Sequence, residues 1–213
     1  MQKILFIDTM ATGMNPERCA IYRLGGIYTE NGVEKARFEF RACPWAGAKI
    51  SEQSLWICSE TRASLARYPK SEDAFRDFIA FLDKRIDVRN PGDKAYIAGF
   101  NASALDVPFL REWFRKNGNE RFRDYFYVQT LDLMSVSAFA LINERRDMQG
   151  FHLNDVAQRL DIYYPGNENY DCIENSKVCL DIFRLLQRQM GINDYYRNTD
   201  TCEKVTRNFT PAK

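Results

Sequence analysis

Two aspartates stand where a carboxylate could take part in phosphoryl-transfer chemistry. Asp8 ends a short apolar run and is followed by a Thr-Gly pair at Thr12 and Gly13. Asp106 falls on the first turn of an apolar helix pattern, shortly after Asn101. Carboxylates at such places often bind divalent metal ions, because Mg²⁺ prefers hard oxygen ligands. The sequence therefore indicates Asp8 as a candidate metal ligand, and it places Asp106 beside a sheet edge as a second place with the character of a site.

Met10 interrupts this pattern. It stands two residues after Asp8, where a second carboxylate would complete a metal-binding pair. Its thioether is a soft ligand of little use to Mg²⁺. Three interpretations are open at this point: an intact active site, a damaged one, and a strand end that only looks like a site.

Length and composition favour one globular domain. The chain has 213 residues, which is enough for a sizeable core, and a net charge of +1, so any basic surface for nucleic acid must be local. We expect a cytoplasmic protein without membrane contact, because no apolar run approaches about 18 residues and no signal peptide is evident. Six cysteines without a C-x-x-C pair, and a single histidine, His152, favour free thiols over a zinc site.

The strand patterns place both aspartates beside a central sheet. Residues 3–7 read as a buried strand with Asp8 at its carboxyl end. Residues 20–29 and 35–42 read as a hairpin, and residues 94–98 as a strand that leads to Asn101. We expect one α/β domain over residues 1–192 and a polar C-terminal tail over 193–213.

Helices are predicted between and after these strands. One begins at Ser51, and the next is capped by Ser71 and has an apolar face made of Ala74, Phe75, Phe78, Ile79 and Leu82. Further helices are predicted from Ala104, over 131–142, over 152–160, and over 169–190, where Gly191 ends the last one.

Together these segments resemble the DnaQ-like 3'-5' exonucleases of the DEDDh type, which share an RNase H-like fold. The family's first motif, Asp-x-Glu-x-Thr-Gly, matches residues 8–13 (DTMATG) except at Met10. Its second motif matches residues 99–110 (GFNASALDVPFL). The segments NPERCAIYRLGGIY, KISEQSLWICSETRASLARYP, TLDLMSVSAFAL and FHLNDVAQRLDI are similar to the elements between its motifs. The resemblance implies a mixed central sheet with an antiparallel hairpin, flanked by helices.

The third motif of this family is His-x4-Asp on the last long helix. Alignment on the Ile-Phe pair at 182–183 puts Tyr170 at the histidine position and Asn175 at the aspartate position. The resemblance implies four acidic ligands for two divalent ions, and of these the chain keeps Asp8 and Asp106. The degenerate catalytic set is thus Asp8, Asp106, Tyr170 and Asn175, with Met10.

Two carboxylates leave a pair of dications under-compensated, so we expect Asp8 and Asp106 to hold one weakly bound ion at most. Loss of the general base removes a further factor of about 10² to 10⁴ in rate. The expected function is a degenerate, inactive exonuclease-like protein that needs no cofactor. It would bind the 3' end of single-stranded DNA or RNA, or a protein partner in replication, repair or another process.

Other interpretations stay open. A sister group of nucleases uses Tyr-x3-Asp, and Tyr170-x3-Glu174 has that spacing. An active exonuclease would then use Asp8, Asp106, Glu174 and Tyr170 with Mg²⁺ or Mn²⁺. Met10 is either an apolar plug in a former metal site or a sign of a wrong alignment register. A third function is that of a structural subunit with a closed, unused cleft.

The resemblance also implies residues that contact the substrate strand. Leu24 follows the family strand that borders the terminal nucleotide, and Thr12 and Gly13 are further candidates for substrate binding. Asn101 would position a backbone or a nucleotide, with a turn residue as the alternative. Phe100 is a candidate for stacking on a base.

Overall fold

The computed structural model describes residues 1–166 and 171–192. Five strands form one sheet in the order β3-β2-β1-β4-β5. β1 pairs antiparallel with β2, and β2 with β3, whereas β1, β4 and β5 run parallel. The expected mixed sheet with an antiparallel hairpin is therefore confirmed. The strands span Lys3–Ala11 (β1), Ile21–Glu30 (β2), Val33–Arg41 (β3), Ala95–Gly99 (β4) and Leu131–Asp132 (β5).

The hairpin between β2 and β3 has the two-residue turn that its sequence predicts. Asn31 and Gly32 have φ values of 48° and 74°, the left-handed values that such tight hairpin turns require. A residue distant in sequence also contacts the hairpin tip: the Arg184 guanidinium donates a hydrogen bond to the Gly32 carbonyl at 2.8 Å.

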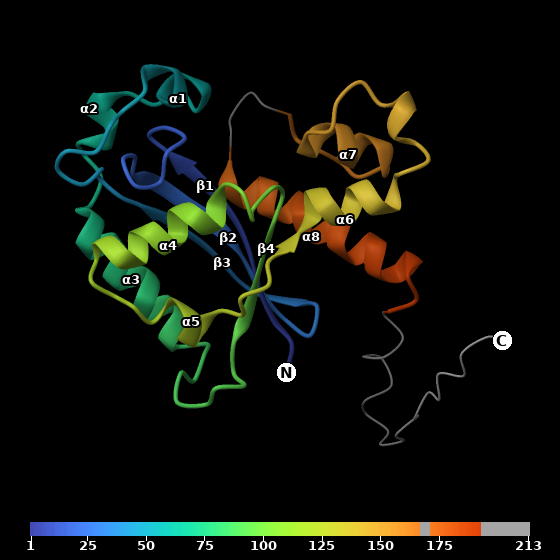
Figure 1. The fold of residues 1–213 in the computed structure, drawn as a ribbon, viewed down its shortest axis with the longest axis horizontal. Helices are drawn as coiled ribbons and strands as arrows, with labels where there is room; N and C mark the ends of the chain where they lie inside the picture. Colours follow the sequence, from blue (N-terminus) through green and yellow to red (C-terminus); the bar gives the residue numbers. More distant parts are fainter. Residues whose placement is uncertain (167–170, 193–213) are drawn as a thin grey trace.

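Helices cover both faces of the sheet (Figure 1). α3 (Ser71–Asp83), α4 (Asp106–Lys116) and α5 (Phe122–Tyr125) share an aromatic core with one face, in which Phe78 stacks on Trp113. α8 (Cys172–Gln189) crosses the other face, with α6 (Leu133–Ala140) and α7 (Leu153–Arg159) beside it. α1 (Glu52–Ile57) and α2 (Arg62–Leu65) lie near the carboxyl end of β1. A short 3-10 helix, Arg145–Asp147, precedes α7.

Gly25 on β2 sets the distance between the sheet and α8. A Cβ atom at this position would lie 2.5 Å from the Cβ of Cys172, the first residue of α8. Real Cβ atoms do not approach so closely, so only glycine allows the start of the helix to pack directly on the strand.

Three expectations about elements need correction. Ser71 is the first residue of α3, not its cap, and its hydroxyl accepts the indole N–H of Trp113 at 2.9 Å, since a buried indole needs an acceptor. The helix expected over 131–142 begins only at Leu133. The two residues before it pair with β4 as the edge strand β5, which is too short to leave a periodic signal in the sequence.

The first strand is also longer than expected. β1 reaches Ala11 because β2 pairs with it along its whole length, so Asp8 lies inside the strand and not beyond its end.

Two findings concern the chain as a whole. None of the helices in the described part of the chain is both long and apolar enough to cross a membrane. The five cysteines within residues 1–166 and 171–192 are free thiols, as the sequence predicted for them.

Candidate active site at the carboxyl end of strand β1

The site forms where β1 continues beyond its parallel neighbour. The last parallel pair joins Phe6 to Ala98, so the segment from Asp8 onward has a partner only on the β2 side. The chain leaves β4 at Gly99, where a Cβ atom would lie 2.8 Å from the Ile7 carbonyl oxygen. The lack of a side chain at Gly99 therefore lets the turn into α4 pass close to β1.

Asp106 is the first residue of α4 and is buried, with 4% of its surface exposed. Its Oδ1 accepts two hydrogen bonds from Thr9, one from the backbone N–H at 2.8 Å and one from the hydroxyl at 2.7 Å. Burial, together with the nearby Asp8 carboxylate, raises the pKa of Asp106 to about 8, against the opposing effect of the Thr9 donors. The structure thus brings the two predicted aspartates together.

Asp8 is half-buried and is bonded from the opposite side, by α8. The side-chain amide of Asn175 donates from Nδ2 to Asp8 Oδ2 at 3.2 Å, and the Tyr164 hydroxyl donates to Asn175 Oδ1 at 3.3 Å. Burial and, second, the negative charge of Asp8 raise the pKa of Tyr164. Sequence reasoning found Asn175 but missed Tyr164. The only local signal was a Tyr-Tyr pair before a Pro-Gly turn.

Met10 lies on the same face of β1 as Asp8, since side chains alternate along a strand. It is 3% exposed and packs with Tyr22, Leu55 and Cys172 in a small apolar cluster. Its thioether is thus enclosed by apolar and aromatic groups, which is the packing that an apolar plug would have.

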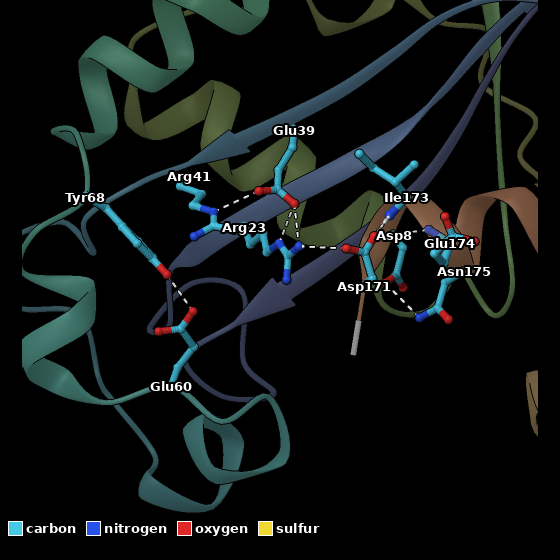
Figure 2. Close-up of polar contacts among 10 residues, drawn as sticks. All are labelled: Asp8, Arg23, Glu39, Arg41, Glu60, Tyr68, Asp171, Ile173, Glu174 and Asn175. Atoms are coloured by element: carbon cyan, nitrogen blue, oxygen red, sulfur yellow. Dashed lines mark hydrogen bonds and ion pairs between the residues drawn. The ribbon is translucent and has the colours of Figure 1, made fainter. Parts of the chain in front are cut away.

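An ion-pair network borders the site on the hairpin side (Figure 2). Arg23, opposite Met10 in the β1–β2 register, contacts Glu39 at 2.5 Å and Asp171 at 3.2 Å. Arg41 bonds the other oxygen of Glu39 at 2.8 Å. Asp171 in turn accepts backbone N–H groups from the first turn of α8. The network therefore connects the hairpin to the start of the helix that carries Asn175.

The other candidates on the third motif fall in different places. Tyr170 lies outside the described residues. Glu174 precedes Asn175 on α8, and its side chain is exposed, whereas Asn175 is 6% exposed and faces Asp8. On α8, therefore, Asn175 and not Glu174 contacts Asp8, and the assignment of motif positions stays a prediction.

The candidates for substrate contact before β2 are buried in the fold. The Thr12 hydroxyl is buried, donating to the Lys49 carbonyl at 2.7 Å and accepting the Ala20 N–H at 2.9 Å. At Gly13, a Cβ atom would come within 2.7 Å of the Cys19 sulfur. Both residues shape the loop after β1, and a role in binding a strand stays a prediction.

The remaining substrate candidates lie in the core and in one turn. Leu24 is fully buried in the aromatic core, on the side of α3 and α4. Asn101 has a φ of 60°, and its backbone N–H donates to Asp132 at 3.2 Å, so it has at least a turn role. Phe100 is half-buried against the core under α8. Contacts of these residues with a nucleotide also stay predictions.

Comparison with solved structures places this architecture in the RNase H-like, exonuclease fold. A product-bound exonuclease I has a TM-score of 0.70 at 16% identity, over 92% of this chain and 46% of that one. E. coli exonuclease I with a dT13 oligonucleotide gives 0.71 at 19% identity, over 92% and 43%. The zinc-bound form of an E. coli exonuclease I complex with single-stranded DNA gives 0.71 at 18% identity, over 93% and 43%. The chain spans less than half the length of these exonuclease I chains.

The family of this chain is identified by a match to a family model. The family model RNase_T, described as exonuclease, matches residues 5–167, so this chain belongs to that exonuclease family. A comparison with curated proteins finds no match.

Two divalent ions fit this donor set poorly. Within the described part of the chain, no group of three or more His, Cys, Asp or Glu side chains is arranged to hold a metal ion. Asp106 already accepts two hydrogen bonds from Thr9, and Asp8 accepts one from Asn175. Two carboxylates and a neutral amide would leave two dications under-compensated in charge, so the residues present do not fit a two-ion centre.

Proposed function

We propose that this protein is a catalytically degenerate 3'-5' exonuclease-like domain of the DnaQ, DEDDh type that binds the 3' end of a single-stranded nucleic acid without hydrolysing it efficiently. The observation that carries the proposal is the hydrogen bond from Asn175 to Asp8. A neutral amide donor stands where the family motif has an acidic ligand.

The enclosed thioether of Met10 supports the same proposal, because a soft and buried sulfur cannot replace a carboxylate toward Mg²⁺ or Mn²⁺. Asp8 and Asp106 remain as ligands for one weakly held ion at most. The alternative ligand set with Glu174 and Tyr170 has less support, since Glu174 is exposed and Asn175 faces Asp8.

A single strand is the ligand that we favour over a protein partner. Exonuclease I, which shares the fold, has been captured with dT13 and dA16 oligonucleotides. The shared fold extends over 92% of the present chain, which supports a similar kind of ligand. A protein partner in replication or repair is the outcome to consider if no strand binds.

The deciding experiment measures shortening of a 3'-labelled single strand in Mn²⁺ by the wild type and by Asp8→Ala. Asp147→Ala, an exposed carboxylate in the 3-10 helix, serves as the control. We expect binding of the strand and little shortening in all three proteins. Shortening that disappears only in Asp8→Ala would show an active enzyme and refute the proposal. Absence of binding to both DNA and RNA strands would point to the protein-partner role.

A further inference from the structure

A chain of two hydrogen bonds runs from Tyr164 through Asn175 to Asp8 in the candidate site. An ionised carboxylate can only accept, so the amide nitrogen of Asn175 must face Asp8 and its oxygen must face the other way. That oxygen accepts from the Tyr164 hydroxyl at 3.3 Å. Tyr164 therefore fixes which end of the Asn175 amide points at Asp8.

This orientation of the Asn175 amide determines which atoms of the candidate site could contact a cation. With its oxygen engaged by Tyr164, Asn175 presents only N–H groups to Asp8, and N–H groups repel a metal ion. Asp106 is satisfied in a comparable way by the two donors of Thr9. These bonds stabilise the carboxylates at Asp106 Oδ1 and Asp8 Oδ2, and a divalent ion would compete with the protein donors for those two oxygens.

We propose that Tyr164 is a positioning residue that holds Asn175 as a hydrogen-bond donor to Asp8, so that a protein donor stabilises the Asp8 carboxylate in place of a divalent ion. This inference rests on the proposed function, because it explains how the two carboxylates persist in a site that no longer needs metal. It adds a residue from the loop before α8 that lies outside all three sequence motifs.

The test measures thermal unfolding of the intact chain with Mn²⁺ and with a chelator. We expect no Mn²⁺-dependent shift in the wild type. Asn175→Asp puts a third carboxylate at the pocket, and its unfolding midpoint should rise by about 5 °C in millimolar Mn²⁺. Tyr164→Phe frees the amide oxygen to turn toward a cation, and its midpoint should rise by about 2 °C.

Two matched variants control for the substitutions themselves. Tyr163→Phe changes the exposed neighbouring tyrosine, which is 83% exposed, and Asn154→Asp adds a carboxylate on the exposed side of α7. Both should match the wild type in their response to Mn²⁺. A purely structural role for Tyr164 would lower the midpoint of Tyr164→Phe equally with and without the ion, and this outcome overturns the inference.

Two other outcomes also overturn it: a wild-type shift as large as that of Asn175→Asp, or no shift in either pocket variant. If Asn175→Asp does not fold, Tyr164→Phe decides alone, with free Mn²⁺ counted by electron paramagnetic resonance. Failure here is distinct from failure of the proposed function. A wild type that binds Mn²⁺ but leaves 3' ends intact overturns only the inference, whereas Asp8-dependent hydrolysis overturns the proposed function.

Discussion

The two aspartates of the candidate site accept hydrogen bonds from different parts of the molecule. Asp106 is buried and accepts two hydrogen bonds from Thr9, on the strand against which α4 packs. Asp8 is half-buried and accepts hydrogen bonds from Asn175 and from the Cys172 thiol, both on a helix that crosses the opposite face. The half of the site around Asp106 therefore depends on the sheet, whereas the half around Asp8 depends on how α8 is docked. The predictions below test whether the two halves respond independently.

The largest effect is expected on the Asp8 side, from Met10→Glu. This substitution restores the acidic residue of the family motif but places it in the apolar cluster of Tyr22, Leu55 and Cys172. Burying a carboxylate among such groups should lower the free energy of unfolding by about 4 kcal/mol. Urea denaturation measures the loss, and Met14→Glu, at a residue that is 75% exposed, is the control. Equal stability of the two variants would mean that the cluster opens readily to water.

The next effect concerns the Asp106 side and depends on pH. The folded protein keeps the proton of Asp106 up to a pKa of about 8, whereas the unfolded chain releases it near 4. Wild-type stability should therefore fall as the pH rises from about 4 to about 8. Asp106→Asn removes this dependence, and near pH 8 it should be more stable than the wild type by on the order of 3 kcal/mol. Unfolding curves at several pH values in this range measure the free energy of unfolding, with Asp147→Asn as the exposed control. If the stability of Asp106→Asn still falls with pH, other groups cause the dependence.

A smaller change is expected when one donor to Asp106 is removed. Thr9→Val keeps the backbone N–H bond but loses the hydroxyl bond of 2.7 Å, at a cost of about 1.5 kcal/mol. The pKa of Asp106 should rise further, because the hydroxyl stabilises the charged form. Thr9→Ser retains the donor and should behave as the wild type. A loss in Thr9→Ser without a loss in Thr9→Val would show that the methyl group, and not the hydroxyl, matters.

The smallest effect is expected at the border of the Asp8 half. Arg23→Met removes the link between Glu39 and Asp171 and should cost about 1 kcal/mol, since Glu39 keeps Arg41 as a partner. Hydrogen exchange should become faster in the first turn of α8, which Asp171 caps, and stay unchanged in α4. Faster exchange in both helices would contradict the independence of the two halves.

Much of the fold was predictable because it depends on local sequence patterns and on family motifs. The turn at Asn31 and Gly32 and the apolar face of α3 follow from residue types at fixed spacing, whereas the pairing of Asp8 with Asp106 followed from the family resemblance. The match of residues 8–13 and 99–110 to family motifs identified the fold class.

What the sequence did not reveal depends on contacts between distant residues. Tyr164 reaches the pocket only because its loop packs beside α8, and nothing in its neighbours distinguishes it from Tyr163. The hydroxyl of Ser71 faces Trp113 across 42 positions, so its local pattern suggested a cap. The ion pairs of Arg23 likewise join three separate elements.

The close approach of Gly25 to Cys172 limits which substitutions the sequence can accept. A library of all substitutions at position 25 should return glycine alone among folded proteins, because even alanine would collide with Cys172. Met10 lies in a small apolar cluster and Asn175 donates to Asp8, and similar libraries at these two positions should accept several neutral residues. The fold thus tolerates substitution of the residues at the motif positions 10 and 175 much more than substitution of Gly25. Metal-ligating residues can therefore be lost one by one in evolution while the fold is retained.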